Sequence, residues 1–79
     1  MPSVLAIDLG TSGVKVAVVD HRGTVRASAT RPLSTTFLAD GGAEQDAEVW
    51  WDEIGACARE IGEQQQRDVA AVAVTAQYM

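Results

Sequence analysis

The sequence predicts an incomplete α/β domain with a mixed sheet and the element order β-β-β-α-β. Three observations predict it: three β-branched runs separated by glycine-containing turns, one apolar stripe at helical spacing, and a final apolar run near the last residue. The chain has 79 residues, whereas single domains mostly have roughly 100–200. A parallel strand that is buried on both faces needs helices on each side of the sheet. Because one helix is predicted, we expect the rest of the domain to lie outside these residues.

The first three strands are predicted to form an antiparallel meander. Residues 4–9 are a nearly continuous apolar run of the kind that is buried on both faces, and residues 14–20 are a second β-branched run. Turns with glycine flank the second run, at residues 10–13 and 21–23. The third run, residues 24–30, alternates polar and apolar side chains, and we expect its apolar set to share one face: Val25, Ala27 and Ala29.

One helix and one further strand are predicted after this meander. Pro32 ends the third strand because proline has no backbone N–H, and residues 33–42 are predicted to be a loop. Asp46 is the predicted N-cap of a helix from residue 47 to about residue 63. Residues 69–74 form a fourth strand, which follows a helical crossover and must therefore run parallel to its neighbour. The apolar stripe of the helix has the spacing of one helical face: Trp50, Ile54, Cys57, Ala58 and Ile61.

Composition and charge exclude several classes of protein. Hydrophobic residues make up 47% of the chain and charged residues 22%, which excludes a mainly disordered chain. The net charge is −5 and Lys and Arg form no cluster, so we expect neither nucleic acid nor a membrane as a partner. A single cysteine, Cys57, cannot form an internal disulfide. The N-terminus has no basic signal-peptide start, and we expect the protein in the cytoplasm.

The turn between the first two strands carries the residues most indicative of chemistry. Asp8 ends the first apolar run, and we expect its carboxylate to hold a hard cation such as Mg²⁺. Glycines allow a backbone to approach an anion closely, and turn N–H groups, hydroxyls and an ammonium can bind phosphate oxygens. The alternative is an ordinary hairpin in which Gly and Ser serve the turn and Asp8 caps backbone groups. The phosphate interpretation assigns five residues: Gly10, Thr11, Ser12, Gly13 and Lys15.

Three segments resemble a known family. The run from Asp8 to Lys15, followed by Asp20 and Gly23, resembles the first phosphate motif of the sugar kinase, hsp70 and actin superfamily. Glu44-Gln-Asp46 with Trp50-Trp51 is similar to the FGGY carbohydrate kinases, in particular to xylulokinase-like members. Those enzymes usually carry proline after this Glu-Gln-Asp, where the present chain has alanine.

The last residues extend the resemblance to the whole chain. Val74 to Met79 is similar to the strand end where FGGY kinases carry a Ser-Gly-Gln or Thr-Asn-Gln sequence that faces the sugar. The resemblance implies that Gln77, Tyr78 and Met79 lie at or beside the substrate pocket. Glycerol kinases have Arg-Glu after this Gln, and xylulokinases typically have Met-His. The present Tyr78-Met79 matches neither, and a pentulose such as xylulose is the favoured substrate.

The resemblance implies a ribonuclease H-like, actin-like ATPase fold that binds ATP and Mg²⁺. It implies transfer of the ATP γ-phosphoryl to a hydroxyl of a sugar or polyol. The catalytic base of the family is an aspartate that we expect beyond Met79, so no catalytic residue is assigned within residues 1–79. We expect the 79-residue chain alone to be inactive and to self-associate through its uncovered sheet.

Two other classes share this start. A non-catalytic ATP-binding protein of the actin or hsp70 kind has the same phosphate turn but lacks the Glu-Gln-Asp and Trp-Trp pair. A ribonuclease H-like nuclease needs further metal-binding carboxylates, and residues 69–74 contain none.

Three single residues have simpler expected roles. Trp50 and Cys57 are expected in the core, and His21 is expected to be a solvated turn residue. The sequence leaves open whether one Trp of the pair lies at the rim of the substrate pocket.

Overall fold

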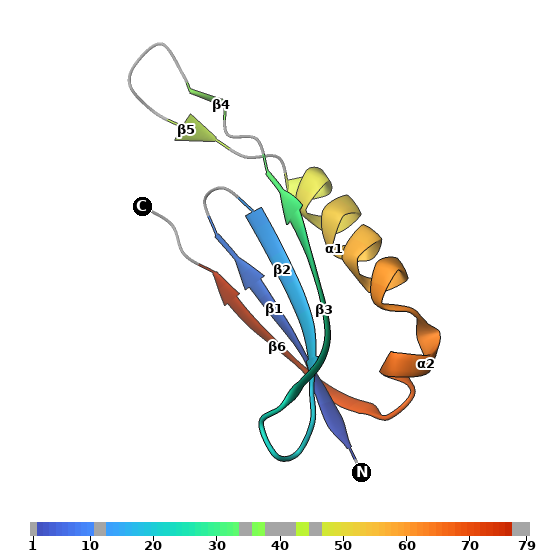
Figure 1. Ribbon diagram of the computed structural model, residues 1–79. Helices are drawn as coiled ribbons and strands as arrows, with labels where there is room; N and C mark the ends of the chain where they lie inside the picture. Colours follow the sequence, from blue (N-terminus) through green and yellow to red (C-terminus); the bar gives the residue numbers. More distant parts are fainter. Residues whose placement is uncertain (1, 11–12, 34–35, 38–42, 45–46, 77–79) are drawn as a thin grey trace.

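The computed structural model describes residues 2–10, 13–33, 36–37, 43–44 and 47–76 (Figure 1). The elements are, in order, β1 (Ser3–Leu9), β2 (Gly13–Val19), β3 (Val25–Pro32), β4 (Thr36–Phe37), β5 (Ala43–Glu44), α1 (Ala47–Ile61), α2 (Glu63–Gln66) and β6 (Val69–Ala76). Four strands form one sheet with the spatial order β3-β2-β1-β6, and β4 pairs with β5 in a separate two-stranded sheet. Helix α1 lies along one side of the larger sheet (Figure 1).

The strand directions confirm the predicted topology. β1 pairs antiparallel with β2, β2 pairs antiparallel with β3, and β6 returns to pair in parallel with β1. The larger sheet is therefore mixed, and it has the predicted order of a meander, a helical crossover and a parallel strand.

Several boundaries differ from the sequence prediction. β3 continues to Pro32, which pairs with Gly13, and this is possible because β3 is the edge strand of its sheet. The segment predicted to be a loop, residues 33–42, contains the short strand β4. Helix α1 ends at Ile61 and not near Glu63, because Gly62 has a φ of 92° that ends the helix.

The core lies between α1 and the face of the sheet that the helix covers. The buried members are Ile7, Val14, Val16, Ala29 and Cys57. Their strand residues occupy alternate positions in register, which is the pattern expected of one sheet face. Cys57 is fully buried, as predicted, and burial raises the pKa of its thiol. Of the tryptophan pair, Trp50 is half-buried, whereas Trp51 is 73% exposed.

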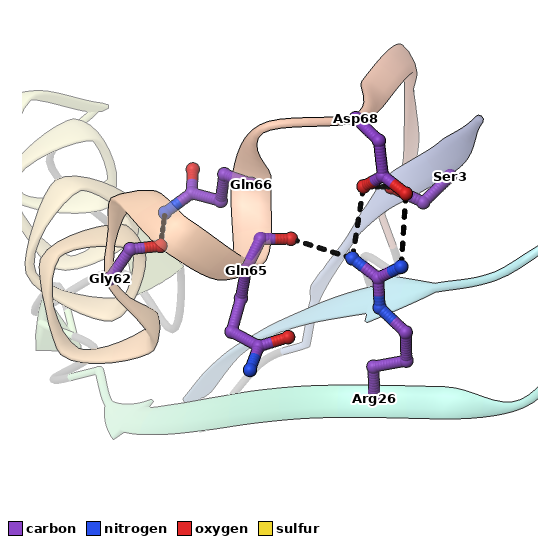
Figure 2. Close-up of polar contacts among 6 residues, drawn as sticks. All are labelled: Ser3, Arg26, Gly62, Gln65, Gln66 and Asp68. Carbon is purple, nitrogen blue, oxygen red and sulfur yellow. Dashed lines mark hydrogen bonds and ion pairs between the residues drawn. The ribbon is translucent and has the colours of Figure 1, made fainter. Parts of the chain in front are cut away.

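A β-bulge changes the predicted alternation of β3. Val18 pairs with Ala27, but Val19 pairs with Val25, so Arg26 is an extra residue between the two pairs. Val25 is 55% exposed as a result, and the expectation that it shares the buried face of Ala29 is wrong. The bulge instead lets the guanidinium of Arg26 reach the segment before β6, where it contacts Asp68 and the carbonyl of Gln65 (Figure 2).

The half of the sheet formed by β1 and β6 is largely uncovered. Helix α1 packs on β2 and β3. Every residue of β6 after Val69 is exposed, including Val72 at 59% and Val74 at 60%. The prediction that residues 4–9 are buried on both faces is wrong for this structure, because Val4 and Asp8 are exposed. The missing cover agrees with the expectation that one helix leaves the sheet incomplete.

Candidate functional site

The turn between β1 and β2 is closed by its two glycines. The N–H of Gly10 donates a hydrogen bond to the carbonyl of Gly13 at 2.9 Å. A Cβ added at Gly13 would lie 3.0 Å from the carbonyl oxygen of Arg31, a tight contact, so the close approach of β3 favours glycine at this position. The nearest atom to a Cβ at Gly10 is 3.6 Å away, which is an ordinary contact. The hairpin interpretation therefore explains Gly13, but packing gives no reason for glycine at position 10.

Beside this turn, four polar residues form a row across the larger sheet. Asp8 of β1 is the register partner of Lys15 on β2 and of Thr75 on β6. Lys15 is in turn the partner of Thr30 on β3. We call Thr30, Lys15, Asp8 and Thr75 the polar row. Register partners on neighbouring strands project to the same face of a sheet, so the row is one line of side chains, all of them exposed.

The polar row lies on the face opposite α1. The covered face carries the residues that alternate with the row, such as Ile7, Val14 and Val16. Among the residues that the structure describes, no ion pair joins Asp8 to Lys15. The carboxylate and the ammonium are therefore side by side, exposed and available to ligands of opposite charge.

The donor set at Asp8 fits Mg²⁺ bound together with phosphates. Within the described part of the chain, no group of three or more His, Cys, Asp or Glu could hold a metal ion by itself. Mg²⁺ in nucleotide sites is commonly held by one or two carboxylates, with phosphate oxygens and waters as the other ligands. A single exposed Asp8 beside a turn suits that arrangement and does not suit a metal cage made only of protein groups.

The predicted site residues divide into two groups. Asp8, Lys15, Gly10 and Gly13 are brought together at one end of the sheet. The other predicted residues lie outside the described residues: Thr11, Ser12, Gln77, Tyr78 and Met79. β1 and β6 are parallel and end at the same edge, with Leu9 the register partner of Ala76. The described residues that precede the two predicted segments, Leu9 and Ala76, are therefore neighbours in the sheet.

Thr75 and Thr30 are members of the row that the sequence reasoning missed. Thr75 is aligned with Asp8 only by the parallel register of β1 with β6. That register depends on a β-bulge between Ser3 and Val4, and sequence patterns do not show it.

The second turn, at the opposite end of β2, has a structural role. The Asp20 carboxylate accepts hydrogen bonds from the N–H groups of Arg22 at 2.9 Å and Thr24 at 3.0 Å. The hydrogen bond from Thr24 is the main cause that lowers the pKa of Asp20. Gly23 has a φ of 83°, and His21 is exposed, as predicted. Asp20 therefore stabilises its turn, far along β2 from the polar row.

The chain is similar to known carbohydrate kinases. Residues 3–79 match the N-terminal domain of the FGGY family of carbohydrate kinases. The chain is 42% identical over 76 residues to glycerol kinase of Rhodospirillum rubrum, and 36% identical over 74 residues to xylulose kinase of Escherichia coli. These alignments cover 96% and 92% of this chain but 15% of each relative. The crystal structure of xylulose kinase from Rhodospirillum rubrum matches with a TM-score of 0.81 and 28% identity, over 98% of this chain and 17% of that one.

The mixed sheet with α1 along one side has the actin-like ATPase fold of sugar kinases. The chain belongs to the FGGY family of carbohydrate kinases, and it spans a small part of the length of its relatives. No helix among the described residues is long and apolar enough to cross a membrane.

Proposed function

We propose that this chain is the N-terminal part of the first domain of an ATP-dependent carbohydrate kinase that acts in the cytoplasm. The reaction is transfer of the ATP γ-phosphoryl to a hydroxyl of a sugar or polyol. The observation that carries the proposal is the pairing of Asp8 with Lys15, exposed side by side next to the glycine turn. Membership of the FGGY family favours a kinase over a nuclease or a non-catalytic ATP-binding protein.

The residues of the turn have distinct roles in this proposal. Asp8 holds Mg²⁺ directly or through water, and the cation supplies charge neutralisation for the phosphates. The Lys15 ammonium binds a phosphate oxygen as a point charge. Backbone N–H groups and hydroxyls complete the phosphate contacts: Gly10, Thr11, Ser12 and Gly13. The catalytic base is an aspartate beyond Met79.

The sugar is bound by the segment that follows β6. Gln77, Tyr78 and Met79 directly follow Ala76 in the sequence, and Ala76 is the register partner of Leu9, the residue before the glycine turn. We favour a pentulose such as xylulose because xylulose kinases are among the relatives and the structural neighbours. The relatives also include glycerol kinases, which makes glycerol the substrate to test against xylulose.

The proposal is tested by kinetics on the full-length protein that carries this chain. ADP release is measured with D-xylulose and with glycerol, at varied Mg²⁺ concentration. Asp8→Ala is expected to lower kcat far more than it raises the KM for the sugar, because Asp8 acts on the metal and the transferring phosphoryl. Asp52→Ala, an exposed aspartate on α1, is the matched control and should change neither constant. An unchanged kcat for Asp8→Ala would remove the metal assignment.

A further inference from the structure

Asp8 has a different polar neighbour on each side. Lys15 on β2 is its antiparallel register partner, and Thr75 on β6 is its parallel register partner. Directly opposite residues of an antiparallel pair have Cβ atoms about 4.5–5.5 Å apart, and neighbouring strands of any sheet lie about 4.7–4.9 Å apart. All three side chains are exposed on the same sheet face. The Asp8 carboxylate can therefore turn toward an ammonium on one side or a hydroxyl on the other.

These two neighbours have opposite consequences for the site. An ion pair with Lys15 would occupy the carboxylate and the ammonium at once, and neither would then be available to a metal or a phosphate. The Thr75 hydroxyl can donate one hydrogen bond to a carboxylate oxygen and leave the other oxygen open. It carries no charge, so it does not compete with a cation.

We propose that Thr75 is a positioning residue that holds the Asp8 carboxylate on the β6 side, away from Lys15, so that Asp8 binds the metal and Lys15 binds the phosphate. The proposal rests on the function proposed above. It adds to that function a residue that acts through Asp8 and the reason for a hydroxyl at this place in β6. The partners that orient metal ligands commonly affect metal affinity by about 10–100-fold.

The test measures the affinity of the full-length protein for ATP by calorimetry, with Mn²⁺ and without any divalent metal. The ratio of interest is the dissociation constant without metal divided by the dissociation constant with Mn²⁺. A larger ratio means that the metal strengthens ATP binding more. Thr75→Val keeps the β-branched shape and removes the hydroxyl, and it should reduce this ratio about 10-fold. Thr75→Ser restores the hydroxyl and should restore the ratio. Thr75→Ala removes the hydroxyl with a smaller side chain and gives a second measurement if the Val variant does not fold.

Two further variants separate positioning from a general structural effect. Thr30→Val makes the same chemical change at the other end of the polar row, beside Lys15 and not beside Asp8, and it should leave the ratio unchanged. In a Lys15→Met background the competing ammonium is absent, so Thr75→Val should have little effect on the ratio. A merely structural role for Thr75 would give the same loss in both backgrounds.

The outcomes distinguish this inference from the proposed function. If Asp8→Asn reduces the ratio but Thr75→Val and Thr75→Ala do not, Thr75 is not a positioning residue, and the metal assignment of Asp8 stands. Equal losses for Thr75→Val and Thr30→Val, or no rescue by Thr75→Ser, also overturn the inference alone. If Asp8→Asn leaves the ratio unchanged, the metal assignment of Asp8 and the inference both fail.

Discussion

The guanidinium of Arg26 forms a two-pronged ion pair with the carboxylate of Asp68. Nη1 donates to Oδ2 at 3.0 Å and Nη2 donates to Oδ1 at 2.9 Å. Oδ1 also accepts a hydrogen bond at 2.8 Å from the hydroxyl of Ser3, which is buried. The three residues join the bulge of β3, the first residue of β1 and the segment that leads into β6 (Figure 2). The pair therefore connects three strands at the end of the sheet opposite the polar row.

The first prediction concerns the pH dependence that this ion pair confers. Arg26, and then Ser3, lower the pKa of Asp68 to about 2 from its usual 3.8. A carboxyl group whose folded-state pKa is lowered stabilises the fold above its unfolded pKa, and this contribution is lost as pH falls toward the folded pKa. Asp68→Asn should therefore lower the melting temperature near neutral pH. The difference in melting temperature between this variant and the wild-type chain should shrink as the pH falls from about 4 to about 2.

Thermal unfolding of both chains over this pH range checks the prediction. Asp52→Asn is the control, since Asp52 is an exposed residue of α1 away from the ion pair, and it should show a smaller difference at neutral pH. If the melting temperature of Asp68→Asn differs from that of the wild-type chain by the same amount down to about pH 2, the ion pair does not stabilise the fold.

The second prediction compares two glycines of the helical region. Gly62 has φ 92° and ψ 156°, a conformation that side chains rarely adopt. Gly62→Ala should therefore destabilise the chain by about 1–3 kcal/mol. Gly55 lies inside α1, where a Cβ would approach only the flexible Arg59 side chain, at 3.2 Å. Gly55→Ala should stabilise the chain by up to about 1 kcal/mol. Urea midpoints followed by circular dichroism should move in opposite directions, and a common direction would contradict the backbone argument.

The sequence predicted the elements of this fold well because their patterns are local. A continuous apolar run predicts β1, a β-branched run predicts β2 and an alternating run predicts β3, with glycine turns between them, and the stripe that contains Cys57 predicts α1. The bulge at Arg26 was not predictable, because no local pattern marks it and the contact of Arg26 with Asp68 is between residues far apart in the sequence. The short pairing of β4 with β5 was missed for a similar reason, since two-residue strands have no periodicity to detect.

The candidate site was predicted residue by residue but not as an arrangement. Asp8 and Lys15 were expected near phosphate from their place around a glycine turn, and the register makes them direct neighbours. The expectation that Asp8 ends a buried strand was wrong, because α1 covers the other face. Thr75 was missed because its relation to Asp8 exists only in the parallel pairing of β1 with β6. A site residue that is defined by strand register can be found only in the three-dimensional structure.

The third prediction concerns specificity for the sugar. Gln77 lies outside the described residues, and it directly follows Ala76, the last residue of β6. Gln77→Ala in the full-length protein should weaken sugar binding by about 1–3 kcal/mol, because substrate hydroxyls lose their amide partner. ATP binding should change little. Gln64→Ala on α2 is the control and should affect neither ligand. Calorimetry with each ligand decides the matter, and equal losses for sugar and ATP would make Gln77 a structural residue.

The fourth prediction is that the 79-residue chain by itself self-associates and releases no ADP when sugar and ATP are added. We expect the catalytic base and the adenosine site of the proposed kinase outside these 79 residues, and phosphoryl transfer needs both. Strand β6 forms an edge of the larger sheet, carries no charge and is exposed along nearly all of its length. Such an edge pairs readily with another chain. Light scattering should therefore give a mass above that of the monomer.

A matched pair of substitutions locates the contact. Val72→Lys places a charge on β6, where Val72 is 59% exposed, and it should shift the chain toward monomer because a charged edge resists pairing. Val49→Lys makes the same change on α1, where the valine is 41% exposed, and should leave the mass unchanged. Both variants alter the net charge equally, so a difference between them cannot arise from overall repulsion. A monomeric unmodified chain, or equal dissociation by both variants, would rule out association through β6. ADP release that depends on added sugar would rule out the expected inactivity.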